Sequence, residues 1–225
     1  AFDGQSGRRL WQQQRSGEAL ILQQAGVLLP VGDTLVVGWS GKLVGLNPLN
    51  GNVRWEAAIA SPRGTNDIER LVDLVAGVSR VDDGLCVRAF QAAVGCVDAA
   101  RGAVLWTKPA TGSSGVHGDR ELLLGVEADS TVVAWRRSDG ERAWSQEILR
   151  YRNLGTPLLA GRSVVVGDGA GLLMQMPDAF MRKEAAKLNI ALPEAGQYAV
   201  GNLFMPQIKD NQAKVEAVIG AIVAE

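Results

Sequence analysis

The chain has 225 residues, of which 47% are apolar, so it can build a packed core in one large or two small domains. A formal net charge of −1 argues against the broad electrostatic field that attracts nucleic acids or anionic membranes. The longest apolar stretch, residues 19–32, is broken by Gln23 and Gln24, so no transmembrane segment is expected.

A short pattern, glycine followed four residues later by tryptophan, occurs four times. The copies end at Trp11, Trp55, Trp106 and Trp144, at spacings of 44, 51 and 38 residues. Spacings of this size are typical of propeller blades. Each glycine is expected to close a turn at positive φ, and each tryptophan to take the same packing position between neighbouring blades.

Short β-rich runs joined by tight turns surround the repeats. Strands are predicted at 35–39, 42–46, 85–89, 93–97, 121–125, 131–135 and 163–167, and another begins at Val53. One four-stranded blade cannot cover its own apolar faces, so blades are expected to stack on each other. The prediction is a mainly β chain, with a partial β-propeller of about four four-stranded blades over residues 1–166.

The two cysteines, Cys86 and Cys96, fall on the two arms of one predicted hairpin, nearly opposite each other. They could form a cross-strand disulfide in an oxidising compartment. We favour the other interpretation, two small apolar side chains buried in a sheet. With a single histidine, His117, the chain offers no zinc-ligand spacing, and neither a metal nor a cofactor site is predicted.

An insertion at residues 61–73, rich in turn formers and charge, separates the second and third repeats. An elaborated loop on a rigid scaffold is a usual place for binding residues. The other candidates have plainer interpretations. His117 is expected to be a solvated loop side chain, and the arginines at 136, 137, 150 and 152 to be exposed charges. The glycines of 167–171 lack the remainder of a phosphate-binding motif.

The character of the sequence changes after residue 166. A short helix is predicted at 177–188, a strand at 198–204 and an amphipathic helix at 210–225. The prediction is a second domain, residues 167–225, that forms a small α+β tail with a C-terminal amphipathic helix.

Residues 1–166 resemble the PQQ-like repeat propellers and, among them, the BamB family, β-propeller lipoproteins of the outer-membrane β-barrel assembly machinery. The resemblance rests on the glycine-to-tryptophan repeat together with segments 19–23, 61–73, 151–157 and 163–168. It implies a ring of eight blades, half of which this chain would supply. It also implies a non-enzymatic scaffold at the periplasmic face of the outer membrane. Because the chain begins inside a repeat, we expect the signal and lipid-anchor segment to lie outside it.

The resemblance further implies docking on the POTRA domains of the barrel-inserting protein BamA, through a Leu-x-Leu-Arg and an Asp-x-Asp segment on neighbouring loops. Leu20 and Leu22 match the first segment, with Gln23 in place of its arginine. Asp73 matches the first acid of the second, and Val75 replaces the other. The two replacements would weaken a charge-assisted contact. Ordinary blade packing is the alternative role of Leu20 and Leu22.

Residues 167–225 resemble the glutaminase domain of the glutamate synthase large subunit, through segments 167–184 and 196–207. Such amidotransferases use an N-terminal cysteine whose own α-amino group is the base. The chain begins with Ala1, and neither cysteine lies in this segment, so the tail is expected to be an inactive fragment. Residues 167–169 fit either parent, and we interpret the chain as a chimaera of two families.

A quinoprotein-type dehydrogenase is the alternative enzyme class, because such enzymes also use tryptophan-containing propeller repeats. The chain has no vicinal cysteine pair, and four blades cannot enclose a central cofactor, so the scaffold is favoured. The terminal blades of an open ring expose sheet edges, which predicts self-association through these edges.

Overall fold

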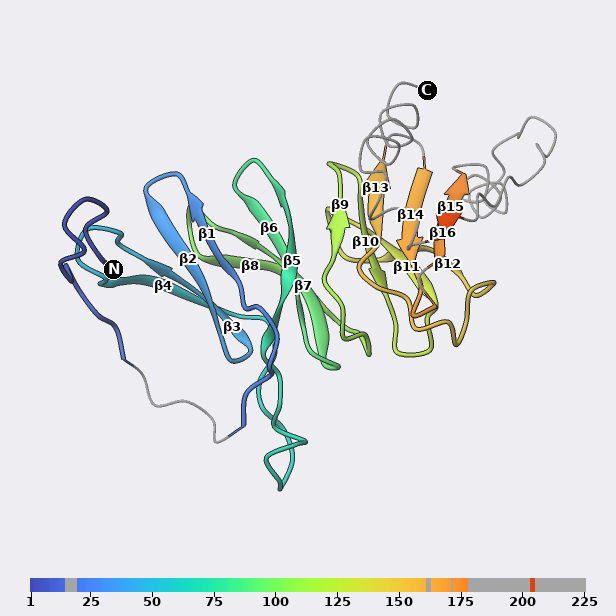
Figure 1. Cartoon of the computed structure of the whole chain (residues 1–225), viewed down its shortest axis with the longest axis horizontal. Coiled ribbons are helices and arrows are strands. Elements are labelled where there is room, and N and C mark those ends of the chain that lie inside the picture. The colour runs from blue at the N-terminus through green and yellow to red at the C-terminus, as the bar shows by residue number, and fades with distance from the viewer. Residues whose placement is uncertain (15–19, 161–162, 171, 178–202, 205–225) are drawn as a thin grey trace. The chain divides into compact units, whose positions relative to one another are not determined.

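The computed structural model describes residues 1–14, 20–160, 163–170, 172–177 and 203–204. The chain divides into two compact units, Ala1–Ser113 and Ser114–Glu225. In the described residues, four antiparallel sheets of four strands each are formed, two in each unit (Figure 1). Strands and turns make up this described part, and it holds no helix long and apolar enough to cross a membrane.

The first unit holds two sheets in which the strands follow chain order. The first sheet contains β1 (Leu28–Val31), β2 (Thr34–Trp39), β3 (Lys42–Leu46) and β4 (Val53–Ala58). The second contains β5 (Leu74–Val81), β6 (Gly84–Ala89), β7 (Ala93–Asp98) and β8 (Ala103–Pro109). The strands predicted in this part of the chain are confirmed as β2, β3, β4, β6 and β7.

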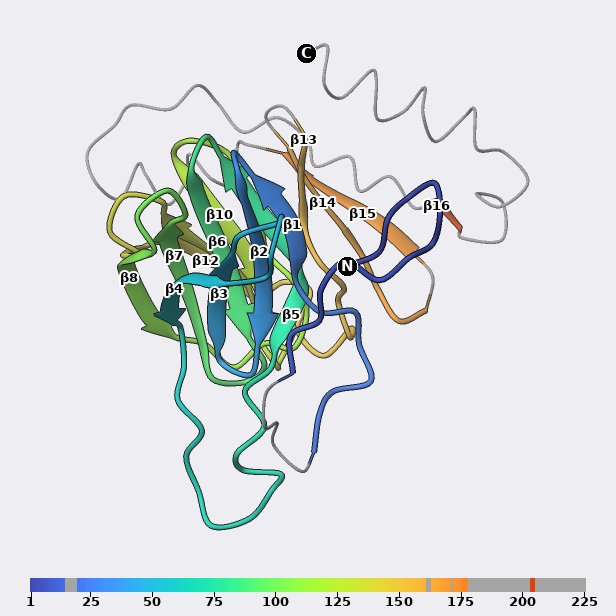
Figure 2. The same ribbon diagram turned by 90° about the vertical axis from the view of Figure 1, so that its left-hand side faces the viewer.

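Apolar side chains of both sheets form one core in the first unit. Val36 and Leu43 of the first sheet and Leu85 and Val87 of the second are completely buried in it. Fully burying an aliphatic side chain of this size stabilises the fold by about 1.5–3 kcal/mol. The stacking of the two sheets, seen in Figures 1 and 2, therefore supplies the burial that neither sheet achieves alone.

The second unit repeats this arrangement. Its first sheet contains β9 (His117–Gly118), β10 (Leu122–Val126), β11 (Val132–Arg136) and β12 (Arg142–Gln146). Its second contains β13 (Leu158–Ala160), β14 (Ser163–Gly167), β15 (Leu172–Pro177) and β16 (Leu203–Phe204). Buried residues of both sheets, including Leu124, Val132 and Val164, share one core. The predictions at 121–125, 131–135 and 163–167 are confirmed as β10, β11 and β14.

The last sheet joins strands from both sides of residue 166, where the tail was predicted to begin. β14 pairs with β15 from Ser163↔Pro177 to Gly167↔Leu173, so residues after 166 belong to the same sheet as residues before it. β16 is the described end of the strand predicted at 198–204, and it pairs with β15 at Leu172 and Leu173. The helices predicted at 177–188 and 210–225 lie outside the described residues, apart from Pro177 at the end of β15.

The four repeat turns share one backbone geometry. The repeat glycines Gly7, Gly51, Gly102 and Gly140 have φ values of 69°, 75°, 68° and 72°, a region that favours glycine. In each turn the glycine N–H donates to the carbonyl oxygen four residues earlier, at 2.8–2.9 Å. The prediction that these glycines close turns at positive φ is confirmed.

The repeat tryptophans explain why the pattern recurs at blade spacing. Trp11 packs on Gly51 of the next repeat, and Trp55 packs on Gly102 of the repeat after that. A Cβ atom added to Gly51 would lie 2.5 Å from the Trp11 ring, and one added to Gly102 would lie 2.3 Å from Trp55 Cγ. Each of these tryptophans therefore covers the turn of the following blade, which is the inter-blade position predicted for it.

Candidate partner-binding surface

The insertion at residues 61–73 links β4 to β5 and is the largest departure from the repeat in the first unit. It extends away from the two sheets, as the long loop of Figure 2 shows. It is braced by its own hydrogen bonds. Thr65 N–H donates to Glu69 Oε2 at 2.9 Å, and Glu69 N–H donates to Asn66 Oδ1 at 2.9 Å. These bonds hold the insertion in a defined shape although its side chains are mostly exposed.

Two of the predicted docking segments meet at one hydrogen bond. The backbone N–H of Leu22 donates to Asp73 Oδ2 at 2.8 Å. Further along the same two segments, Ala76 N–H donates to the Ala25 carbonyl oxygen at 3.1 Å. The Asp73 carbonyl oxygen also accepts from Phe90 N–H at 2.9 Å, which ties this position to the end of β6. The structure thus brings Leu22 and Asp73 together, although 51 positions separate them in the sequence.

Neither predicted leucine belongs to the buried core. Leu20 is 40% exposed, and Leu22 is half-buried. Two isoleucines outside the predicted docking residues are more exposed still. Ile21, between the two leucines, is 70% exposed, and Ile68, on the insertion, is 76% exposed. Exposed apolar side chains on loops indicate a binding surface. This indication requires the structure, because the sequence does not show which side chains are exposed.

The two positions that differ from the family motif behave differently. Gln23 is exposed beside Leu22, where its amide can form neutral hydrogen bonds. Val75 is buried in β5 at 4% exposure, so it adds nothing to the accessible surface. Of the motif's charged side chains, Asp73 remains, and its carboxylate already accepts a hydrogen bond from Leu22.

A cavity of about 400 Å³ lies between the insertion and the second sheet. The lining residues that decide its chemistry are Arg63, Glu69 and Val72 from the insertion, and Gln91, Ala93, Thr107 and Lys108 from the sheet. Val72 and Ala93 are buried and make an apolar floor. The other five side chains are polar or charged and form the rim. Val72 directly precedes Asp73, so one segment of chain serves both the cavity and the Leu22 contact.

A second cavity, of about 480 Å³, lies at the opposite ends of β4 and β8. Charged side chains dominate it, and Arg54 Nη1 contacts Asp33 Oδ1 at 2.7 Å. The hydrogen bond and charge of Arg54 lower the pKa of Asp33 below its ordinary value. Asp33 is highly exposed, so solvent screens this pair and it adds little to stability.

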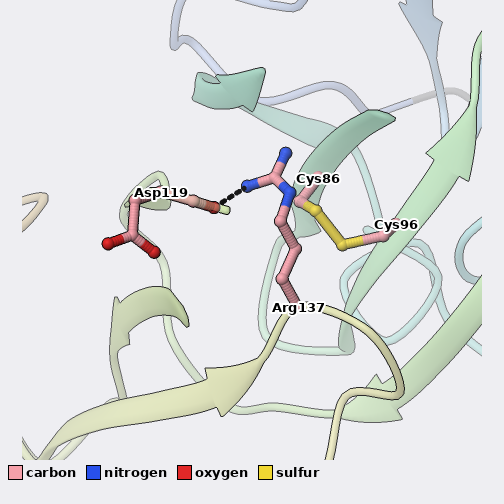
Figure 3. The surroundings of a disulfide bond; sticks show 4 residues. All are labelled: Cys86, Cys96, Asp119 and Arg137. Atoms are coloured by element: carbon pink, nitrogen blue, oxygen red, sulfur yellow. Dashed lines mark hydrogen bonds between the residues drawn. A yellow bond between two sulfur atoms is a disulfide. The ribbon is translucent and has the colours of Figure 1, made fainter. Parts of the chain in front are cut away.

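Cys86 and Cys96 form a disulfide between β6 and β7 (Figure 3). The two residues are direct cross-strand partners, with their Cα atoms 4.0 Å apart. Both side chains are buried, as predicted, but the favoured interpretation of two unpaired apolar residues is wrong. The sequence predicted that the two cysteines lie nearly opposite each other on one hairpin. It did not predict the exact strand register, which makes them direct partners.

His117 is not the solvated loop residue that was predicted. It lies in β9, is half-buried, and its Nδ1 accepts a hydrogen bond from Leu159 N–H of β13 at 3.1 Å. Burial lowers the pKa of His117 below its ordinary value of 6.5, and the Asp119 carboxylate opposes part of this shift. A neutral imidazole therefore connects β9 and β13, the first strands of the two sheets in the second unit.

The arginines that were predicted to be simple exposed charges all have partners. Arg152 donates two hydrogen bonds to Asp168 Oδ2, at 2.9 and 2.6 Å, and Arg150 pairs with Asp129 at 3.0 Å. Arg136 pairs with Asp139 at 2.9 Å. Arg137 Nη1 donates to the Asp119 carbonyl oxygen at 3.1 Å, the dashed line of Figure 3. In the described part of the chain, no group of three or more His, Cys, Asp or Glu side chains is placed to hold a metal ion.

Two family models match different parts of the chain. Residues 1–146 match the family described as "Outer membrane protein assembly factor BamB", and residues 160–225 match "Glutamine amidotransferases class-II". The chain thus joins segments of two families, as the sequence predicted. The second match begins at the end of β13, earlier than residue 167, and so includes β14 and β15 of the last sheet.

Individual relatives agree with the first match. The chain is 37% identical over 174 residues to "Outer membrane protein assembly factor BamB" of Bordetella pertussis, and covers 45% of that protein with 76% of its own length. It is 33% identical over 175 residues to the protein of the same name from Burkholderia pseudomallei, covering 46% of it with 77% of its own length. The chain therefore spans about half the length of the curated relatives it matches.

The fold is similar to that of a solved protein. The crystal structure of BamB from Moraxella catarrhalis aligns with a TM-score of 0.73 at 20% identity, over 90% of this chain and 59% of that one. This likeness confirms the predicted partial β-propeller. Because a family model matches well over half of its length and a relative shares 37% of its aligned residues, the chain belongs to the BamB family of outer membrane protein assembly factors.

Proposed function

We propose that the propeller segment is a non-enzymatic interaction scaffold in the assembly of outer-membrane β-barrel proteins. Its partner is the POTRA region of BamA, and it binds through Leu20, Leu22 and Asp73. Family membership supports a role in outer-membrane protein assembly, because the matched relatives are named outer membrane protein assembly factors. Since the chain spans about half of those relatives, the partner and the site are argued from its own residues.

The hydrogen bond from Leu22 N–H to the Asp73 carboxylate carries the proposal. It fixes two segments from distant parts of the sequence into one surface. The exposed Leu20 and Ile21 then supply apolar contact area next to that fixed point. An interface needs such apolar anchors on a rigid support, with polar groups around them.

Binding of the complete chain to the purified POTRA domains, measured by isothermal titration calorimetry, tests this function. We expect the combined substitution of Leu20, Leu22 and Asp73 by alanine to weaken binding by at least about tenfold, because two apolar contacts and one carboxylate are lost. A matched control replaces Leu49, Leu105 and Asp33, all exposed in the first unit, by alanine. Binding that is equally strong in both variants would remove these loops from the interface.

We place the protein at the periplasmic face of the outer membrane. The Cys86–Cys96 disulfide supports this location, because disulfides persist in oxidising compartments such as the bacterial periplasm and are rare in the cytosol. Alkylation of free thiols in cells that make the chain tests it. Labelling of either cysteine without prior reduction would contradict an oxidising location.

We further propose that the amidotransferase-like tail has no glutaminase activity in this chain. The thiolate is the nucleophile in such enzymes. Neither of the two cysteines of the 225 residues lies within 160–225, and they are joined to each other. Ammonia release from glutamine by the purified chain, above a buffer control, would overturn this and favour the second candidate function.

Self-association is the last part of the proposal. The chain spans about half the length of its relatives, and the terminal blades of a partial propeller expose strand edges that recruit other strands. Light scattering should therefore detect species larger than the monomer that increase with concentration. A monodisperse monomer at all concentrations would contradict it.

A further inference from the structure

The cavity beneath the insertion has the features of a site built for a ligand rather than of a packing defect. Its outer wall is held by the insertion's own hydrogen bonds, Thr65 to Glu69 and Glu69 to Asn66. Its volume of about 400 Å³ falls in the range of pockets that bind small molecules or single anchoring side chains. The wall therefore keeps its shape without an occupant.

The floor of this cavity selects an apolar group. Val72 and Ala93 are buried there, and Ile59 lies beside them at 4% exposure. The charged residues that line the cavity, Arg63, Glu69 and Lys108, are exposed or half-buried. A partner's leucine, isoleucine or aromatic side chain would bury apolar surface on entering, as interface anchors do.

The rim selects a carboxylate. The Arg63 guanidinium forms no hydrogen bond or ion pair with any residue that the structure describes. The neighbouring Glu69 carboxylate is occupied, since it accepts the Thr65 N–H at 2.9 Å. Lys108 also lines the cavity but has a partner of its own, so Arg63 is the cation available to a charged ligand. A guanidinium binds a carboxylate through paired hydrogen bonds.

A third feature is an exposed amide on the facing rim, which an extended segment of a partner could use. Gln91, on the facing rim, has a φ of 48° in the turn between β6 and β7, an uncommon value for a residue other than glycine. Its N–H is bonded to the Gly112 carbonyl oxygen at 3.0 Å, so the backbone of this turn is held while the side chain is exposed. An exposed amide can donate to and accept from the backbone of an extended segment.

We propose that this cavity is an anchor pocket for an acidic segment of the partner protein, with one large apolar side chain in the pocket and a carboxylate on Arg63. The inference rests on the proposed function, because the partner is the one that binds the surface around Leu20, Leu22 and Asp73. The pocket and the docking surface are adjacent because they share one segment of chain. Val72 lines the pocket, and the next residue, Asp73, accepts a hydrogen bond from the Leu22 N–H.

Two substitutions test the pocket in the complete chain, with the purified POTRA domains as the probe in isothermal titration calorimetry. Arg63→Glu reverses the rim charge, and Thr107→Trp fills the pocket from an exposed position on β8. Each should weaken binding by at least about tenfold, the size expected for losing a charge-assisted contact or a buried anchor. Thermal melts of both variants should match the parent chain, because both residues are exposed.

Each variant has a matched control in the same unit. Arg101→Glu makes the same charge change in the cavity at the opposite ends of the strands, and Leu105→Trp adds the same ring to an exposed position on β8. Both controls should leave the affinity unchanged. If Arg63→Glu and Thr107→Trp bind as the parent chain does while the Leu20, Leu22 and Asp73 variant does not, the pocket is overturned and the proposed function stands. If the parent chain itself does not bind, both are overturned.

Discussion

The second and fourth sheets contain the same four-strand plan but complete it differently. In the second sheet, residues 99–102 link β7 to β8, and β7 pairs along its whole length, from Ala93↔Pro109 to Asp98↔Ala103. In the fourth sheet, residues 178–202 lie between β15 and β16, and the described pairing is limited to Leu172 and Leu173. The first three strands follow the same plan in both sheets, and the segment that leads to the fourth strand differs in length.

This difference shows what the glycine-to-tryptophan repeat does. The repeat turn brings the outer strand back at once, and its tryptophan then covers the turn of the following blade, as Trp55 covers Gly102. The sequence holds no tryptophan after Trp144, so no copy of the repeat follows β15, and residues 160–225 match a different family. Strand pairing therefore extends the last sheet across the junction without the repeat, whereas in the first unit the repeat supplies the turn and the tryptophan that join successive blades.

Disrupting the repeat contact in the second sheet should have the largest effect. Gly102→Ala puts a Cβ where the Trp55 ring lies, and does so at a φ of 68°. The unfavourable φ costs about 1–2 kcal/mol and overpacking about 1–3 kcal/mol, so the free energy of unfolding should fall by about 2–5 kcal/mol. Urea unfolding followed by tryptophan fluorescence measures it.

Gly7→Ala is the control for this substitution. Gly7 has nearly the same φ, 69°, but no atom lies within 4 Å of its Cβ position among the described residues. It should lose only the conformational part, about 1–2 kcal/mol. Equal losses at the two glycines would mean that the contact between Trp55 and Gly102 adds nothing to the free energy of unfolding.

Removing the disulfide should weaken the second sheet by a smaller amount. The bond joins residues ten positions apart, and a loop of that length restricts the unfolded chain by about 2–3 kcal/mol. A chain carrying Cys86→Ala and Cys96→Ala should unfold at correspondingly lower urea concentration. The parent chain, unfolded in the presence of a reductant, should behave like the variant. If the reductant does not change the unfolding midpoint of the parent chain, the disulfide does not stabilise the fold.

The fourth sheet can be tested at the point where the two family segments meet. Asp168 follows β14, its side chain is 2% exposed, and Arg152 donates two hydrogen bonds to it. Arg152→Ala would leave a buried carboxylate with two hydrogen bonds fewer, at a cost of about 1–2 kcal/mol. Arg150→Ala, which breaks exposed pairs with Asp129 and Glu147, should cost less than 1 kcal/mol. If both variants unfold alike, the junction is not held by this ion pair.

The sequence predicted most of the fold because the repeat states it several times. Alternating apolar runs predicted the strands. The glycine of each repeat predicted a turn at positive φ. Three features needed the structure. The pairing of Cys86 with Cys96 depends on strand register, the contact of Leu22 with Asp73 depends on two distant segments meeting, and the partner of His117 is a backbone N–H that sequence does not mark.

The smallest predicted effect is a pH dependence in the fourth sheet. Leu159 N–H of β13 donates to His117 Nδ1, which requires a neutral ring, and burial lowers the pKa of His117 in the folded chain. The unfolded chain therefore binds this proton first, so the contribution is fully present above about pH 6.5 and is lost as the pH falls through that value towards the lower folded pKa. Melting temperatures between pH 8 and pH 5 measure it, and His117→Asn, which keeps an acceptor but cannot titrate, should flatten the dependence. A slope unchanged by His117→Asn would assign the titration to a group other than His117. The attachment of the fourth sheet to β9 would then not depend on the imidazole.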